Sequence, residues 1–206
     1  MVKKCVFSTL FMVALLTFIS GCSFFSPKFF VDPSLTGEKV TAGGIAVFPV
    51  ILGQSVIIAG GIESYCRDAG EEMTARIKKR QPAIRILSPA DVSSILNKEN
   101  LVPDYSKMAE DYQKTGILNT VIAKKLAEAL GVKYFIINRL ISLYREEKSA
   151  VAILNTQVWS AEESHLVFEC NKKEANSGFF SPPYDKAVKY VTLSSTATLT
   201  SVLWKK

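Results

Sequence analysis

The sequence predicts an α/β fold, with a single mixed sheet of about five strands and helices packed on it. Short apolar runs bounded by glycine or proline alternate with helical patterns over residues 45–131, and this alternation is typical of α/β units. Three strand-like segments separated by short polar turns then fill residues 134–170, which favours an antiparallel meander. A last helical pattern follows, so all three observations place the helices on one sheet.

The amino-terminal stretch has the pattern of an export signal. Lys3 and Lys4 precede an apolar run over 6–19, which is shorter than the roughly 20 residues that cross a bilayer as a helix. Small residues then precede Cys22. A charged start, a short apolar run and small residues before a cut predict a secretory signal peptide over residues 1–21.

The stretch Ile19-Ser20-Gly21-Cys22 resembles the lipobox of bacterial lipoproteins. The resemblance implies diacylglycerol on the Cys22 thiol, cleavage before Cys22 and acylation of the new amino terminus, and two or more acyl chains anchor a protein stably. An ordinary signal peptide with an incidental cysteine is the alternative. Ser23 stands where lipoproteins retained in the inner membrane of Gram-negative bacteria usually have Asp, so the resemblance implies the outer membrane, with the domain facing the periplasm.

We expect residues 22–43 to form a lipid-anchored tether and residues 44–206 to form a single α/β domain. The tether has several prolines and glycines and no sustained period, which indicates irregular structure. Its phenylalanines, Phe24, Phe25, Phe29 and Phe30, either lie at the lipid headgroups or wrap onto the domain. A domain of this size can fold without a disulfide or a metal.

Composition narrows the function classes. The net charge is +6, without a long basic run, so nucleic acid is not indicated as a partner. Beyond the signal and Cys22, the cysteines are Cys66 and Cys170; they are predicted to be buried, either as two small hydrophobic side chains or as a disulfide in an oxidising compartment. No cofactor motif or metal-ligand spacing is present, and the single histidine, His165, has no partners in the sequence for a catalytic triad or a zinc site.

The first half of the domain reads as strand, loop, helix, strand and helix. We predict a buried strand over 45–50, then a flexible, glycine-rich apolar loop over 53–61 that lacks the phosphate-binding motifs. An amphipathic helix follows from residue 62 and ends before Pro82. A strand over 84–87 precedes a helix that runs to about Asn97, because Ser88-Pro89-Ala90-Asp91 combines a capping serine, an early proline and an acid three residues on.

The second half reads as two helices, three strands and a helix. Residues 101–103 are expected to interrupt the helical pattern, and a new helix is predicted over 107–115. The next helix, capped by Asn119 or Thr120, ends at Gly131. The three strands are predicted over 134–144, 150–159 and 166–170, and residues 172–180 as a loop. The final helix starts at Ser181-Pro182-Pro183, and its threonine-rich end is unfavourable for a helix.

Several segments resemble a group of bacterial envelope lipoproteins. They are residues 45–50, the helix end over 94–101, Ala129-Leu130-Gly131 followed by the aromatic and apolar residues 134–137, and the strand and turn over 158–164. The group includes the penicillin-binding-protein activator lipoproteins, the curli secretion channel lipoprotein and the amino-terminal domain of TolB. The resemblance implies the TolB amino-terminal-like fold and a binding role, and it supports fold more than function.

We therefore expect a non-enzymatic lipoprotein that binds, or helps to assemble, another cell-envelope protein. Two apolar segments without an evident core role are the candidate docking residues, Val56, Ile57 and Ile58 in the first and Phe179 and Phe180 in the second; folding back onto the core is the alternative for both. An oligomeric secretion pore like the curli channel is the second functional hypothesis, since the two longest strands could span a barrel wall. A wall hydrolase is disfavoured, because no paired acids, Ser/His pair or metal set stands out.

Overall fold

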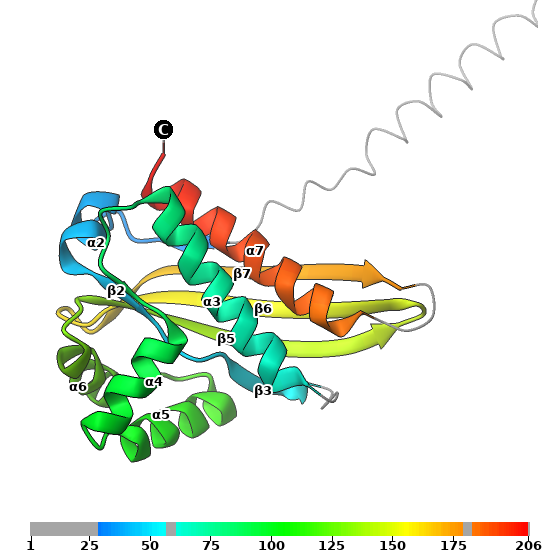
Figure 1. Ribbon diagram of the computed structural model, residues 1–206, viewed down its shortest axis with the longest axis horizontal. Helices are drawn as coiled ribbons and strands as arrows, with labels where there is room; N and C mark the ends of the chain where they lie inside the picture. The colour runs from blue at the N-terminus through cyan, green and yellow to red at the C-terminus, as the bar shows by residue number, and fades with distance from the viewer. Residues whose placement is uncertain (1–28, 57–60, 179–182, 206) are drawn as a thin grey trace, which may run out of the picture.

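A computed structural model describes residues 29–56, 61–178 and 183–205. The predicted fold class is confirmed: the described residues form one mixed sheet of seven strands in the order β1-β7-β6-β5-β2-β4, with β3 paired to β5, and six helices pack on it (Figure 1). The strands are β1 Phe29–Val31, β2 Ile45–Val47, β3 Ile51–Val56, β4 Ile86–Leu87, β5 Tyr134–Glu146, β6 Ser149–Ser160 and β7 His165–Ser177. The helices are α2 Gly37–Gly43, α3 Ile62–Arg80, α4 Pro89–Lys98, α5 Val102–Thr115, α6 Thr120–Leu130 and α7 Tyr184–Leu203.

The antiparallel meander β5-β6-β7 is the centre of the sheet. All three strands are longer than the sequence indicated, and β7 continues to Ser177 where a loop over 172–180 was expected. Residues 171–177 alternate between exposed and half-buried positions. They have few large apolar side chains, so their sequence reads as a polar loop although the backbone is paired with β6 as far as Ser149↔Ser177.

The glycine-rich segment predicted as a flexible loop contains strand β3. Ile51–Val56 pairs in parallel with β5 across a register shift between Leu52 and Ser55. Gly53 permits this pairing, because a Cβ at that position would lie 2.7 Å from the carbonyl oxygen of Ile141. The glycine therefore allows close approach of two backbones, and the interpretation of residues 53–56 as loop was wrong.

Residues 29–43, within the predicted tether, are folded onto the domain. β1 pairs antiparallel with β7, and α2 starts at a cap in which the Thr36 hydroxyl accepts from the amide of Lys39. Val40 of α2 is fully buried against Ile45 and Leu203. The indole of Trp204 donates to the carbonyl of Gly37 at 3.2 Å. This hydrogen bond joins α2, near the start of the described chain, to the residue that follows α7.

The remaining helices begin and end where local signals place them. In α4, Ser88 and Asp91 form the predicted reciprocal cap. Gly131 takes a left-handed conformation at the end of α6, as expected. Helix α5 starts earlier than predicted, because Pro103 lies in its first turn, where the missing amide costs no hydrogen bond. The threonines of α7 bond back to carbonyls one turn earlier, as in Thr196 to Thr192 at 2.7 Å, which satisfies their hydroxyls within the helix.

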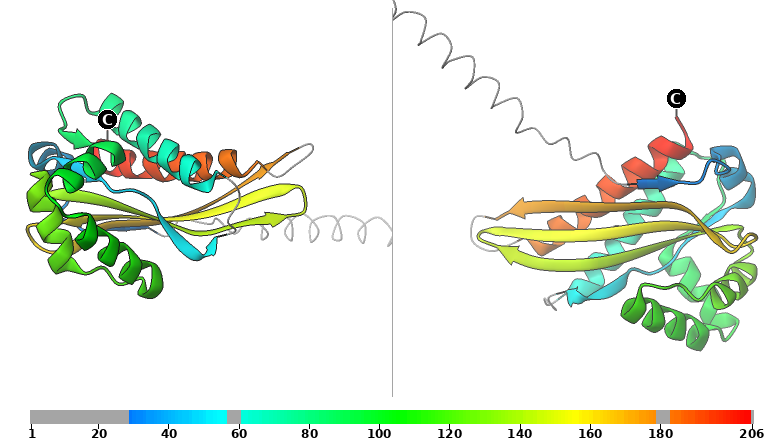
Figure 2. Two further views of the ribbon diagram at one scale, coloured as in Figure 1. Left: turned by 60° about the horizontal axis from the view of Figure 1, so that its bottom comes forward. Right: turned by 180° about the vertical axis from the view of Figure 1, so that it is seen from behind.

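The two faces of the sheet are covered unequally. Helices α3 and α7 lie across one face of β5, β6 and β7, whereas α4, α5 and α6 gather beside β2 and β3 at one end of the other face (Figure 1). Seen from behind, β6 and β7 have no helix of the described chain over them (Figure 2). We call this uncovered side of β5–β7 the open face. Within the described residues, no helix has both the length and the apolar character needed to cross a membrane.

Candidate functional site

The predicted lipidation site, Cys22, lies outside the described residues, and so do four of the five residues predicted to dock a partner: Ile57, Ile58, Phe179 and Phe180. Val56 is described. It ends β3, is half-buried and packs in a cluster with Ile62 and Tyr184. Ile62 follows the first predicted docking segment and Tyr184 comes after the second, so the structure brings described residues that flank both segments to the same apolar cluster.

Cys66 and Cys170 are both buried, as predicted, and both are free thiols. They belong to different apolar clusters: Cys66 lies in the second turn of α3, and Cys170 lies on β7 beneath α7. Burial raises the pKa of the Cys66 thiol to about 12. The Cys170 sulfur lies 3.1 Å from the hydroxyl of Ser195. The disulfide that the sequence left open is not formed in this structure.

A network of amide side chains lies on the open face. Asn155 and Gln157 alternate along β6 and are almost fully buried. The amide nitrogens of both donate to the same oxygen of Glu169 on β7, at 2.7 and 2.9 Å. The Trp159 indole donates to the carbonyl oxygen of Gln157 at 3.0 Å. The carboxylate and the indole thus hold both amides in one orientation.

Helix α5 closes one side of this network. The hydroxyl of Tyr112 donates to the Gln157 carbonyl oxygen at 2.9 Å, and burial raises the pKa of Tyr112 to about 12. The guanidinium of Arg139 lies 5.6 Å from the centre of the Tyr112 ring and donates to the carbonyl of Gln113 at 3.0 Å. The Arg139 Nε is buried and has no hydrogen-bond partner among the described residues.

Sequence analysis missed this network, although the signal was present. Asn155, Thr156 and Gln157 are three consecutive polar residues in the middle of the predicted strand 150–159, and polar side chains that become buried in a strand need hydrogen-bond partners. Thr156 points to the other face, where it contacts Asn138 and Ser195. Glu169 accepts from both amides, but it does not lie in such a run of polar residues, so the sequence does not single it out.

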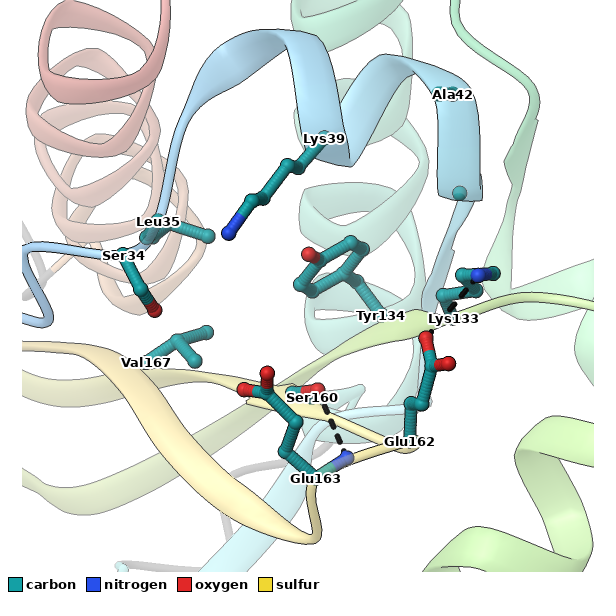
Figure 3. Close-up of a pocket in the computed structure, with 11 residues that line it drawn as sticks. Ser34, Leu35, Lys39, Ala42, Lys133, Tyr134, Ser160, Glu162, Glu163 and Val167 are labelled. Atoms are coloured by element: carbon teal, nitrogen blue, oxygen red, sulfur yellow. Dashed lines mark hydrogen bonds and ion pairs between the residues drawn. The ribbon is translucent and has the colours of Figure 1, made fainter.

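A second candidate site is a hollow of about 300 Å³ at the end of the sheet. It lies between α2 and the turn from β6 to β7, with Lys39 and Tyr134 on one side and Glu162 and Glu163 on the other (Figure 3). Burial, followed by the two nearby glutamates, raises the pKa of Tyr134. The hydroxyl of Ser160 accepts the amide proton of Glu163 at 3.2 Å, so this serine supports the turn.

His165 stands beside this hollow but serves a different contact. One ring nitrogen lies 3.2 Å from a carboxylate oxygen of Asp32 and the other 3.4 Å from Glu163. The imidazole thus links the amino-terminal segment after β1 to the turn between β6 and β7. Among the described residues, no group of three or more metal-binding side chains could hold an ion.

No protein-family model and no curated protein sequence matches the chain. Solved structures do. A PelC dodecamer from Paraburkholderia phytofirmans superposes with a TM-score of 0.52 at 8% identity, covering 88% of this chain and 99% of that one. The hypothetical protein CT253 from Chlamydia trachomatis gives 0.50 at 12% identity, covering 80% and 99%.

A more distant match is the C-terminal domain of LpoB from Escherichia coli, with a TM-score of 0.41 at 15% identity over 68% of this chain and 86% of that one. At these identities the likeness concerns the fold alone. The chain therefore has an α/β fold similar to those of PelC and CT253.

Proposed function

We propose that this chain is a non-enzymatic lipoprotein, anchored by acylated Cys22 to the outer membrane and facing the periplasm, that binds or helps to assemble another protein of the cell envelope through the open face. The lipobox-like stretch before Cys22 supports the anchor. The observation that carries the binding role is the helix-free open face, where half-buried Trp159 and Glu169 are held in place by the buried amides of Asn155 and Gln157.

The open face has the properties of a preorganised protein-binding surface. The carboxylate of half-buried Glu169 is already fixed, because the buried amides of Asn155 and Gln157 both donate to it. Side chains that are rigid before binding lose little rotamer freedom when a partner arrives, so less of the interaction energy is spent on ordering them. Trp159 and Tyr144, both half-buried, add aromatic area of the kind enriched at binding hot spots.

Site-specific photocrosslinking in cells tests this role. Tyr144 points to the open face, because its partner Val151 alternates with Ala150 and Ala152, which pack under α7. Benzoylphenylalanine keeps the aromatic ring of the tyrosine and adds a benzoyl group that extends outward from it, so we expect a discrete adduct from position 144. The matched control is Tyr190, an exposed tyrosine on α7. Equal adducts from both positions, or none from position 144, would contradict the assignment of the face.

A second candidate function is assembly into a ring of identical subunits, as part of a secretion or pore complex. The likeness to a protein solved as a dodecamer favours it, since the match covers almost the whole of that chain. Native mass spectrometry of the acylated protein in detergent separates the two functions. A monomer with a heterologous adduct at position 144 supports the leading proposal, whereas a discrete large oligomer whose adducts join two copies of the chain supports the ring.

A further inference from the structure

We infer that the β1 edge of the domain rests on the lipid bilayer and sets the orientation of the whole protein. Phe29 and Phe30 of β1 are large apolar side chains with 49% and 46% of their surface exposed. They pair with Cys170 and Glu169 on β7, and neighbouring residues of a strand point to opposite faces. One ring therefore stands on each side of the sheet edge.

The position of these rings along the chain selects lipid as the occupant. Phe29 is seven residues after Cys22, and an extended chain of that length reaches at most about 25 Å. This step rests on the proposed acylation of Cys22. With that anchor, β1 stays next to the headgroups whatever protein binds elsewhere, so a partner protein would have to enter a narrow gap between edge and membrane.

Further residues of types found at membrane interfaces lie along the same edge, on β7 and α7. Lys172 and Lys173 follow the residue paired with Phe29. Beyond them, Tyr190, 48% exposed, lines a hollow beside Glu174 and Asn176. Tyrosine is enriched at membrane interfaces, and lysine extends its amine to headgroup phosphates while its stem stays against apolar surface. Glu169, which is paired with Phe30, and Glu174 are acidic residues on this edge, so the aromatic side chains, rather than charge, hold the edge on the bilayer.

The opposite side of the molecule provides the contrast. Ile117 and Val121, at the turn from α5 into α6, are 73% and 79% exposed. These helices lie beside β2 and β3, across the sheet from β1 (Figure 2). When the β1 edge meets the bilayer, this pair is directed away from it. The open face then stands steeply to the membrane, accessible to proteins in the periplasm.

Photocrosslinking to lipid tests the inference. The acylated full mature chain, with benzoylphenylalanine at position 30, is reconstituted in vesicles of phosphatidylethanolamine and phosphatidylglycerol in a three-to-one ratio. We expect lipid adducts by mass spectrometry in several-fold greater yield than from the control, benzoylphenylalanine at position 121. Equal yields at the two positions would overturn the inference, and so would an adduct at position 30 that joins two protein chains.

The same samples separate this inference from the proposed anchor. Their intact mass reports whether Cys22 carries acyl chains. If it does not, the anchor fails, while the yield at position 30 after mixing with the same vesicles still decides whether the edge contacts lipid. In a Cys22→Ser chain, the Phe29→Ser/Phe30→Ser double variant should float with vesicles several-fold less than the Cys22→Ser parent. The Ile117→Ser/Val121→Ser double variant should float as well as that parent. If only the second variant lost flotation, the β1 edge would not be the lipid contact.

Discussion

Replacing Tyr112 by phenylalanine removes one hydroxyl from the amide network and leaves the ring in place. The side chain is 1% exposed, and its hydroxyl donates to the Gln157 carbonyl oxygen at 2.9 Å. That oxygen keeps a second donor, the indole of Trp159 at 3.0 Å. Because the main acceptor stays paired, we expect Tyr112→Phe to lower the free energy of unfolding by about 1 kcal/mol, the net contribution of one neutral hydrogen bond.

Replacing Gln157 by leucine is the harsher change in the same contact. It removes the acceptor of two donors, the Tyr112 hydroxyl and the Trp159 indole, and one donor to Glu169. Buried donors without a partner cost about 1–3 kcal/mol, so we expect a loss near the upper end of that range. In the Gln157→Leu background the Tyr112 hydroxyl keeps only the more distant side-chain oxygen of Asn155, at 3.4 Å, so Tyr112→Phe should then cost much less than it does with glutamine at position 157.

Equilibrium unfolding in urea measures all four members of this cycle on the mature chain carrying Cys22→Ser. The expected coupling between the two positions is about 1 kcal/mol. Tyr190→Phe, which removes a hydroxyl from an exposed tyrosine, serves as the control and should leave the midpoint unchanged. If Tyr112→Phe costs as much with Leu at position 157 as with Gln, the hydroxyl is not bonded to Gln157 and the description of the network is incorrect.

Three further predictions concern the sheet, the thiols and the amino-terminal strand. Gly53→Ala should release β3 and speed amide exchange over 51–56, because the new Cβ would meet the Ile141 carbonyl at 2.7 Å; exchange as slow as in the parent would refute the close approach. Burial raises the pKa of both thiols, that of Cys66 to about 12, so iodoacetamide at pH 8 should leave the folded mature chain, which begins at residue 22 and carries Cys22→Ser, unlabelled, since the thiolate is the nucleophile. The unreduced, unfolded mature chain should take two labels, and fewer than two would indicate a bridge. Hydrogen bonds from Ser34 lower the pKa of Asp32 below 3.8. The charged carboxylate therefore stabilises the fold above that pH, and the stabilisation is lost as the pH falls through the folded pKa. The β1 amides should lose protection from exchange below about pH 4 in the parent, and they should lose less in Asp32→Asn.

Local signals predicted much of the fold. The cap formed by Ser88 and Asp91, the glycine after Leu130 and the apolar stripe of α3 each act within one or two turns of helix, so the sequence states them directly. The three central strands were also predicted, because their apolar content is high where they are buried. These elements sufficed for the α/β class and the meander.

Features that depend on a distant partner were not predictable in the same way. β3 reads as a loop because Gly53 disfavours a strand until β5 lies against it. The end of β7 is polar and becomes a strand only by pairing with β6. Glu169 receives its role from two amides on a neighbouring strand. In each case tertiary contacts override local preference.

The proposed anchor at Cys22 would determine the compartment, the edge that faces the membrane and the accessibility of the open face. Intact-mass analysis of the protein extracted from its own membranes tests it directly. We predict a chain that begins at Cys22 and carries the mass of a diacylglycerol and an additional acyl group, and we predict that Cys22→Ala abolishes both modifications. A chain that retains residues 1–21, or that starts elsewhere without lipid, would contradict the proposal.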